Sequence, residues 1–302
     1  MKVKSKLSEK AFYEEVKLAF ARNMNLKEGE VIINKVVKQN DQTLYGLAVN
    51  LGEGVSPQFY LNDFYDYYLG GIPVESIAQF ISDKFEEILN NMPFVPDINF
   101  EYEKVKDRLC FQLLDKERNI KRLENAIYED LGNGLVLTYS ISCSADDNGG
   151  IFTTAVTKDL ASEYGYDIEQ LKLDALESTA KKFPPTFNDA ESMLKRKFKK
   201  DMKAKKGKEM YILRSSNYYH GSAALYYPGV METIGEFFEM DYYVIPSSIE
   251  EVIIVPINSE RTGYELKTLL VDSNITCIEE NEVLSNTLYK YEFDSKRLVE
   301  WA

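Results

Sequence analysis

Apolar residues recur at helical spacing near the start of the chain. They fall at i, i+4, i+7 and i+8, which places them on one face of a helix, and the residues concerned are Phe12, Val16, Ala19 and Phe20. Ser8 precedes them as a cap. The spacing then becomes that of strands, because "VIINKVVK" and "TLYGLAVNL" flank the polar loop "QNDQ" and "PQFYL" follows. We therefore expect a helix and then an antiparallel meander of three strands.

The next segment, "LNDFYDYYLGG", is rich in tyrosine and phenylalanine. Its apolar positions form one helical stripe, which consists of Leu61, Phe64, Tyr65, Tyr68 and Leu69. Asn62 is placed to cap this helix, and the pair of glycines is placed to end it. Burial of the stripe against the meander leaves Asp63, Asp66 and Tyr67 on the solvent side. These three residues are the candidate interaction surface.

A second amphipathic helix runs from "PVES" to the interruption "NMPFVP", which completes an N-terminal module of a helix, three strands and two helices over residues 1–95. A central α+β module follows over residues 96–187. It contains the alternating strand "GLVLTYSISC", its hairpin partner "IFTTAVT" and a helix capped by Asp167. We expect residues 188–208 to form a basic linker helix.

The C-terminal α+β module, over residues 209–302, contains a similar mixture of helices and hairpins. Expected strands are "EMYILRSS", both halves of "DYYVIPSSIEEVIIVP", "ITCI" and "TLYKYEF", and expected helices lie over "GVMETIGEFFEM" and "YELKTLLVDSN". Because strands and helices occur in clusters and not in strict alternation, the pattern predicts an α+β fold. We expect antiparallel meanders and hairpins packed with helices, in two or three modules.

Charge and composition narrow the class of protein. The 302 residues include 49 acids and 36 bases, a formal charge of −13 that opposes loose binding to nucleic acid or to anionic membranes. No apolar run approaches the roughly 20 residues of a membrane span, and the N-terminus lacks a signal-peptide core. The three scattered cysteines predict neither a disulfide framework nor a zinc ribbon. We expect a cytoplasmic protein without a membrane segment.

One stretch departs from the acidic average. The run "KRKFKKDMKAKKGK", residues 195–208, holds nine Lys and Arg and one Asp. Its first part is a basic patch that consists of Lys195, Arg196, Lys197, Lys199 and Lys200. Such a patch can bind a phosphate backbone or an acidic partner, but interleaved aromatic residues are sparse, which favours a solvated helix face. Elsewhere the charge argues against nucleic acid.

The inventory of reactive residues excludes several mechanisms. The chain has one histidine, His220, so a multi-histidine metal site is not available, and we expect this residue to be a polar loop histidine. The phosphate-binding patterns GxxxxGK[ST] and GxGxxG are absent. The stretch "DDNGG" lacks the spaced acids of a calcium loop and predicts a hairpin turn. We expect no cofactor and no metal, and the sequence leans against an enzyme.

Four stretches, in this order, resemble a known family: "SPQFYLNDFYDYYLGG", "DKERNIKRLENAIYEDLGNGLVLTYSI", "MYILRSSNYYHGSAALYYPGVMETIGEFF", and "YYVIPSSIEEVIIVP" with "NEVLSNTLYKYEF". The family is bacterial, is catalogued as domain of unknown function 5688, and is similar to this chain from roughly residue 8 to residue 293. The resemblance implies a setting near mobile elements but no reaction.

The resemblance also has a local departure. Relatives commonly have a Ser-Ser-x-His-Glu pattern where this chain has Ser247, Ser248, Ile249, Glu250 and Glu251. A metal ligand or base at that histidine would be lost in this member. We therefore favour a structural role for the turn, with serine side chains bonded to local backbone.

Three hypotheses about function remain open. The leading one is a non-enzymatic cytoplasmic interaction or accessory protein of a bacterial mobile element or phage, with a protein partner. The first alternative is an anti-defence protein that mimics nucleic acid or sequesters a host factor, which predicts acids spaced along one face. The second is a histidine-independent, hydrolase-like enzyme around Ser247, Ser248, Glu250 and Glu117. The sequence does not indicate the oligomeric state.

Overall fold

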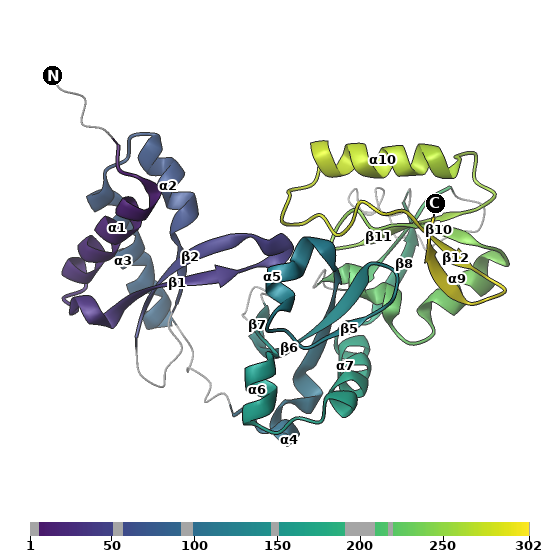
Figure 1. Ribbon diagram of the computed structural model, residues 1–302, viewed down its shortest axis with the longest axis horizontal. Coiled ribbons are helices and arrows are strands. Elements are labelled where there is room, and N and C mark those ends of the chain that lie inside the picture. The colour runs from purple at the N-terminus through teal and green to yellow at the C-terminus, as the bar shows by residue number, and fades with distance from the viewer. Residues whose placement is uncertain are drawn as a thin grey trace. The chain divides into compact units, whose positions relative to one another are not determined.

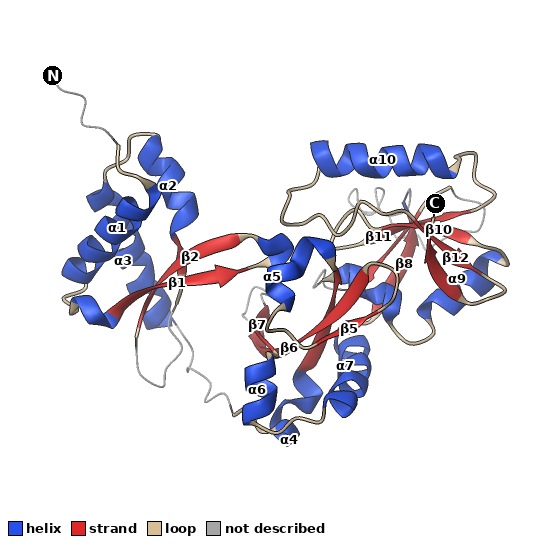
Figure 2. Ribbon diagram, in the orientation of Figure 1, coloured by secondary structure: helices blue, strands red, loops and turns tan. Residues whose placement is uncertain are grey.

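The chain divides into two compact units in the computed structural model, which describes residues 6–50, 57–91, 99–145, 151–190, 209–216 and 220–301 (Figure 1). Unit 1 consists of Met1–Lys38 and Gln42–Asp97, and unit 2 consists of Gln39–Asp41 and Ile98–Ala302. Helices and antiparallel sheets occur in clusters in both units (Figure 2). The predicted α+β fold class is therefore confirmed. The central and C-terminal modules that the sequence suggests both fall within unit 2.

Unit 1 packs helices on an antiparallel sheet of three strands in the order β1-β2-β3. The strands are β1 (Val31–Val37), β2 (Thr43–Val49) and β3 (Phe59–Tyr60), and the helices are α1 (Glu9–Asn23), α2 (Leu61–Leu69) and α3 (Val74–Asn91). Their apolar faces meet in one core, whose fully buried members include Phe12, Val16, Phe20, Leu47, Leu61 and Ile81. The helical stripe at the start of the chain is thus the inner face of α1.

The start of α2 differs from the expected one. The helix begins at Leu61, and Asn62 does not cap it. Instead the side-chain Oδ1 of Asn62 accepts a hydrogen bond from the backbone N–H of Tyr45 at 2.8 Å. Because an asparagine side chain can bond to a neighbouring strand as readily as to its own helix, local sequence alone did not distinguish the two roles. This hydrogen bond links α2 to β2.

The apolar stripe of α2 lies at the edge of the core. Phe64, Tyr65 and Tyr68 are half-buried and pack against it. The Tyr65 hydroxyl donates to the carbonyl of Leu7 at 3.0 Å, and the Tyr68 hydroxyl accepts from the N–H of Leu7 at 2.9 Å, so both tyrosines satisfy their polar ends there. Leu69, which the stripe predicted to be buried, is 40% exposed. The stripe is therefore buried at its beginning and solvated at its end.

Unit 2 contains two antiparallel sheets. The first has the order β4-β6-β5, with β7 paired to β6, and consists of β4 (Leu109–Asp115), β5 (Tyr128–Asp130), β6 (Leu135–Ala145) and β7 (Ile151–Ala155). The second has the order β13-β12-β10-β11-β9-β8 and consists of β8 (Pro185–Asp189), β9 (Tyr211–Ser215), β10 (Tyr242–Ile245), β11 (Val252–Pro256), β12 (Tyr289–Glu292) and β13 (Arg297–Glu300).

Helices cover these sheets. They are α4 (Tyr102–Val105), α5 (Ile120–Leu123), α6 (Lys158–Glu163), α7 (Ile168–Lys182), α9 (Val230–Phe238) and α10 (Gly263–Thr276). Short 3-10 turns add η2 (Gln39–Asp41), η3 (Lys106–Arg108), η4 (Glu117–Asn119) and η5 (Gly221–Tyr226). The η2 turn bonds within unit 2, where the N–H of Asn40 donates to Asn119 Oδ1 at 2.9 Å and Asp41 Oδ1 accepts from the N–H of Arg122 at 3.0 Å.

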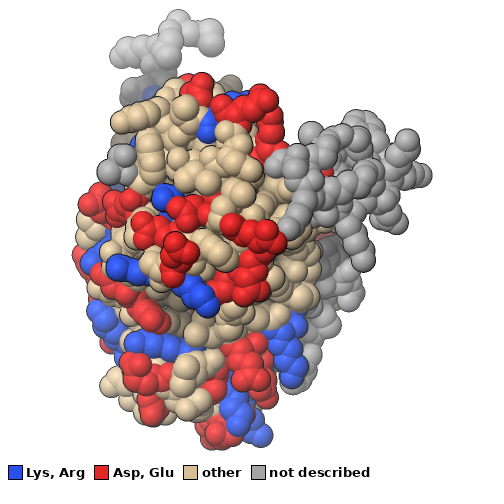
Figure 3. Space-filling view, turned by 90° about the vertical axis from the view of Figure 1, so that its right-hand side faces the viewer, with Lys and Arg blue, Asp and Glu red and all other residues tan. Residues whose placement is uncertain are grey.

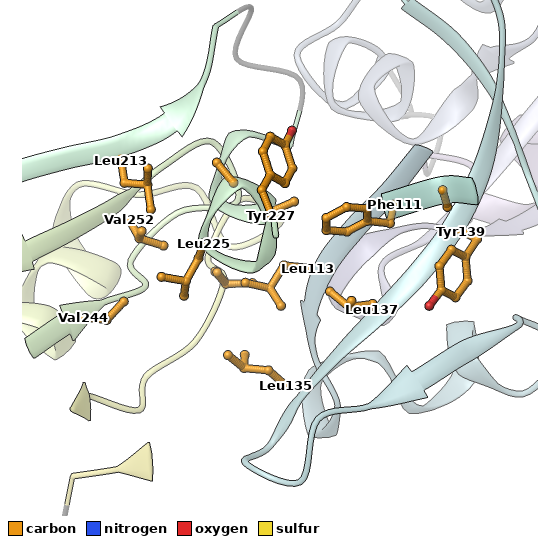
Figure 4. Close-up of a cluster of buried hydrophobic side chains, with 14 of the residues drawn as sticks. Phe111, Leu113, Leu135, Leu137, Tyr139, Leu213, Leu225, Tyr227, Val244 and Val252 are labelled. Carbon is orange, nitrogen blue, oxygen red and sulfur yellow. The ribbon is translucent and has the colours of Figure 1, made fainter. Parts of the chain in front are cut away.

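One large core joins the two sheets of unit 2. Side chains of β4 and β6 face η5, and the second sheet lies on the other side of η5 (Figure 4). The members of this contact that are at most 3% exposed include Phe111, Leu113, Leu135, Leu137, Tyr139, Leu213, Leu225, Tyr227, Val244 and Val252. The opposite face of the second sheet packs on α10 through Tyr243, Ile245 and Val255. Along β10, Val244 faces the shared core, whereas its neighbours Tyr243 and Ile245 face α10. Successive side chains of a strand point to opposite faces of the sheet.

Some elements differ from the sequence prediction. The predicted strand "ITCI" is wrong, because α10 continues through Thr276. The strands β5, β8 and β13 were not predicted. Each of them is only three to five residues long. The strand β8 pairs with the distant β9, with Pro185 opposite Ser215, whereas β5 and β13 pair with the strands next to them in the chain. Strands this short contain too few residues to show an alternating pattern, and the distant partner of β8 is not part of its local sequence.

Leu225 offers a test of the shared core. The side chain is fully buried in η5 between the two sheets. We expect Leu225→Ala to lower the free energy of unfolding of unit 2 by about 2–5 kcal/mol, because the substitution removes apolar contacts and leaves a cavity. Leu173→Ala on α7 is the matched control, since Leu173 is 61% exposed, and it should change stability by less than about 0.5 kcal/mol. Urea unfolding measures the loss of stability in both variants. An equal loss in Leu225→Ala and Leu173→Ala would contradict the shared core.

Candidate functional site

The turn between β10 and β11 gathers three of the residues singled out from the sequence, Ser247, Ser248 and Glu250. Both serines are buried. The carbonyl of Ser247 accepts from the N–H of Leu284 at 3.2 Å, and the Oγ of Ser248 accepts from the N–H of Glu250 at 3.0 Å. Ser248 also forms a β-bridge with Val283. The side chain of Ser248 thus bonds the local backbone of the turn, whereas Ser247 bonds through its own carbonyl.

The first residues of η5 lie directly against this turn. The N–H of Ser222 donates to the carbonyl of Ile249 at 3.1 Å. A Cβ atom at Gly221 would lie 2.0 Å from the carbonyl oxygen of Glu250 and 3.0 Å from Cβ of Arg214. Only glycine permits this approach, because a backbone carbonyl cannot move aside like the end of a flexible side chain. The close approach brings the preceding residue, His220, to the same place.

His220 is the residue whose environment the sequence did not reveal. It has a left-handed backbone, with φ 40° and ψ 51°, and it is half-buried with its Nδ1 shielded from solvent. Burial, followed by the charge of Arg122, lowers the pKa of His220 from 6.5 to about 3. The imidazole is therefore neutral at physiological pH. It can accept or donate a hydrogen bond there, but it cannot act as a protonated acid.

Glu250 is shifted in the opposite direction. Burial raises its pKa from 4.5 to about 7, the neighbouring carboxylates of Glu282 and Glu251 add to the rise, and Arg214 opposes it. Arg214 Nη1 lies 3.4 Å from Glu251 Oε2, so its charge is shared between the two acids. A carboxyl with this pKa can take up or release a proton near neutral pH. That property is typical of general acids and bases, and also of structural clusters of acids.

The other sequence candidates lie elsewhere. Glu117 is exposed at the start of η4, where its N–H donates to Asp115 Oδ1 at 2.9 Å. The basic patch Lys195, Arg196, Lys197, Lys199 and Lys200 lies outside the described residues, as does the loop "DDNGG". Among the described residues, no group of three or more His, Cys, Asp or Glu is arranged to hold a metal ion. Each helix in the described ranges is too short or too polar to span a bilayer.

The remaining candidates, Asp63, Asp66 and Tyr67, lie together on α2 of unit 1. Their spacing of three and four residues places them on one helical face, and all three are exposed. The ring of Tyr67 contacts Phe64 at a centroid distance of 6.4 Å, and Phe64 in turn contacts Phe80 of α3 at 6.0 Å. We call Asp63, Asp66, Tyr67, Phe64 and Phe80 the α2–α3 surface. The sequence suggested Asp63, Asp66 and Tyr67, assigned Phe64 to the buried stripe and did not suggest Phe80.

A family model described as a family of unknown function, DUF5688, matches residues 9–293. The match covers nearly the whole chain, so the protein belongs to this family and the resemblance seen in the sequence is confirmed. Comparison with curated proteins and with solved structures found no match.

The pKa of Glu250 predicts a stability that depends on pH. The unfolded chain releases this proton near pH 4.5, and the folded protein keeps it to about pH 7. The folded state thus binds more protons in this window, and its stability falls as pH rises through it. Glu250→Gln cannot release this proton. We therefore expect its free energy of unfolding, relative to that of wild type, to be about 1–2 kcal/mol higher at about pH 8 than at about pH 4, a range reduced to allow for solvent screening. Guanidinium unfolding at both pH values measures the gain.

The exposed Glu260→Gln serves as the control for this comparison. The difference between its free energy of unfolding and that of wild type should be the same at both pH values. If the stability difference between Glu250→Gln and wild type is also the same at both pH values, the Glu250 carboxyl titrates alike in the folded and unfolded states.

His220 predicts the opposite slope. The unfolded chain protonates its histidine below pH 6.5, whereas the folded protein resists protonation to about pH 3, so stability falls as pH falls. We expect wild type to lose about 1–2 kcal/mol more than His220→Asn on going from about pH 8 to pH 5. Asparagine tolerates the left-handed backbone and has no proton to gain. If His220→Asn loses as much stability as wild type on going to acid pH, the imidazole does not stay neutral in the folded protein.

Proposed function

We propose that the protein is a non-enzymatic binding protein and that its α2–α3 surface recognises a basic segment of a protein partner. The observation behind this proposal is the exposure of two aromatic rings that are held in a row. Tyr67 is 58% exposed and Phe80 is 51% exposed, and Phe64 lies between them in contact with both. Exposed aromatic rings that are already fixed in place are typical of protein interaction sites.

The charge around these rings indicates the chemistry of the partner. The two helices contain six acids and one base: Asp63, Asp66, Glu75, Asp83, Glu86, Glu87 and Lys84. The base is already paired, because Lys84 Nζ lies 2.5 Å from Glu87 Oε2. Lysine or arginine side chains of a partner can stack on Tyr67 or Phe80 while carboxylates balance their charge. A basic segment therefore fits this surface better than an acidic or purely apolar one.

Two other functions have weaker support. Nucleic-acid mimicry calls for acids along one face, yet acidic and basic side chains are interspersed on the face of the molecule in Figure 3. An enzymatic role of the Ser247–Glu250 turn is favoured by the raised pKa of Glu250. However, both serines that would have to react are buried, and the Oγ of Ser248 already accepts a backbone hydrogen bond. We rank this role second.

The cellular setting is part of the same proposal. A cytoplasmic accessory protein of a bacterial mobile element or phage would use such a surface to engage a host or element protein. This setting rests on the family resemblance and not on the geometry of the surface.

The double variant Tyr67→Ala with Phe80→Ala tests the proposed surface. Partners are captured from a host extract and cross-linked, and the cross-linked Lys- or Arg-rich segment is synthesised as a peptide. We expect the peptide to bind wild type, to lose at least about tenfold in affinity for the double variant, and to weaken on raising salt from about 0.05 to 0.5 M. Leu173→Ala, which removes another exposed apolar side chain, should bind like wild type.

A second peptide, with its basic residues replaced by glutamine, checks the role of charge. It should bind neither protein. Equal affinity of wild type and the double variant for the original peptide would contradict the proposal, provided that circular dichroism shows both proteins to be folded.

A further inference from the structure

A small pocket of unit 2 lies beside the C-terminal end of α10. Its volume is about 370 Å³, which is near the lower end of the range for small-molecule sites. Its lining combines polar residues from three segments with an apolar wall. The residues are Arg118, Asn274, Asn286 and the acidic Glu280 on the polar side and Ile275, Ile278 and Val283 on the apolar side. A pocket with one polar and one apolar side orients a small amphipathic ligand.

Asn274 supplies a buried acceptor to this pocket. The residue is 8% exposed. Its Nδ2 donates to the carbonyl of Ser285 at 3.0 Å and to Asn286 Oδ1 at 2.8 Å, so the orientation of the amide is fixed by two acceptors. Its Oδ1 has no hydrogen-bond partner among the described residues. A buried amide oxygen left in this state costs free energy, which a ligand donor would recover.

Arg118 supplies a donor from a second segment of the lining. Its Nε is buried and has no acceptor within the described part of the chain. Its Nη2 makes only a long contact, 3.5 Å, with the carbonyl of Glu280. A guanidinium with a free Nε–H and a weakly engaged Nη2 offers the two parallel donors that a carboxylate accepts.

Asp115 holds these two segments in fixed positions. Its Oδ1 accepts from the N–H of Arg118 at 3.1 Å, and its Oδ2 accepts from the Oγ of Ser285 at 2.7 Å. Ser285 in turn provides the carbonyl to which Asn274 donates. The donor and the acceptor of the pocket are therefore linked through one carboxylate. Both atoms are shielded from solvent, so a ligand reaches them once the side chains in front of them move.

We propose that this pocket binds an α-amino acid with an aliphatic side chain. The carboxylate of the amino acid pairs with Arg118, and its ammonium donates to Asn274 Oδ1. The aliphatic side chain lies on Ile275, Ile278 and Val283. Each unpartnered polar atom of the pocket then has a partner of the right sign, and the apolar wall is covered.

Calorimetric titration of the full chain with L-leucine, L-isoleucine and L-valine tests the proposal. We expect at least one of them to bind with a dissociation constant between about 10 μM and 1 mM. N-acetyl-L-leucine lacks the ammonium and L-leucinamide lacks the carboxylate, so each should bind at least about tenfold more weakly than leucine. The absence of binding by all three amino acids at about 10 mM would overturn the proposal.

Variants locate the binding. Arg118→Ala should reduce affinity at least about tenfold, and Asn274→Leu should do the same if it folds. Arg297→Ala is the matched control, because Arg297 lines a different pocket of about 420 Å³ with Leu298 and Tyr226, and it should leave affinity unchanged. Unchanged affinity in Arg118→Ala, or an equal loss in Arg297→Ala, would place the amino acid elsewhere and overturn the assignment.

Discussion

The close packing of η5 between the two sheets of unit 2 is the constraint on which the rest of that unit depends. Ala223 and Ala224 are small enough for the sheets to approach, and Leu225 fills the space between them. The approach fixes where η5 begins, and this beginning is Gly221 against the carbonyl of Glu250. The geometry of the β10–β11 turn therefore follows from core packing as well as from the serines within it.

This packing also explains the electrostatics of the turn. Burial disfavours charge of either sign, so His220 stays neutral and Glu250 keeps its proton to a higher pH than usual. The two residues have opposite effects on the pH dependence of stability, so their contributions to it partly cancel. Unit 1 differs, because its distinctive groups are the exposed rings and acids of the α2–α3 surface.

Much of the fold could be predicted from the sequence because its longer elements have a regular period. The helices α1, α3 and α7 and the hairpins β1–β2, β6–β7 and β10–β11 follow from spacing alone. The short strands β5, β8 and β13 could not, since three to five residues are too few to show a clear period. Of the site, the serines and Glu250 were visible as a turn motif. His220 and Arg214 were not, because only the tertiary fold brings them to that turn, although the His-Gly pair at 220–221 was a local sign of a tight approach.

Native-state hydrogen exchange of the whole chain distinguishes one shared core in unit 2 from two separate cores. Amides in β4 and β6 belong to the first sheet, and amides in β10 and β11 belong to the second. If η5 joins the sheets into one core, the most protected amides of both should open with the same free energy and the same dependence on denaturant. If the first sheet opens at a free energy more than about 2 kcal/mol below that of the second, the two sheets fold independently and the shared core does not hold unit 2 together.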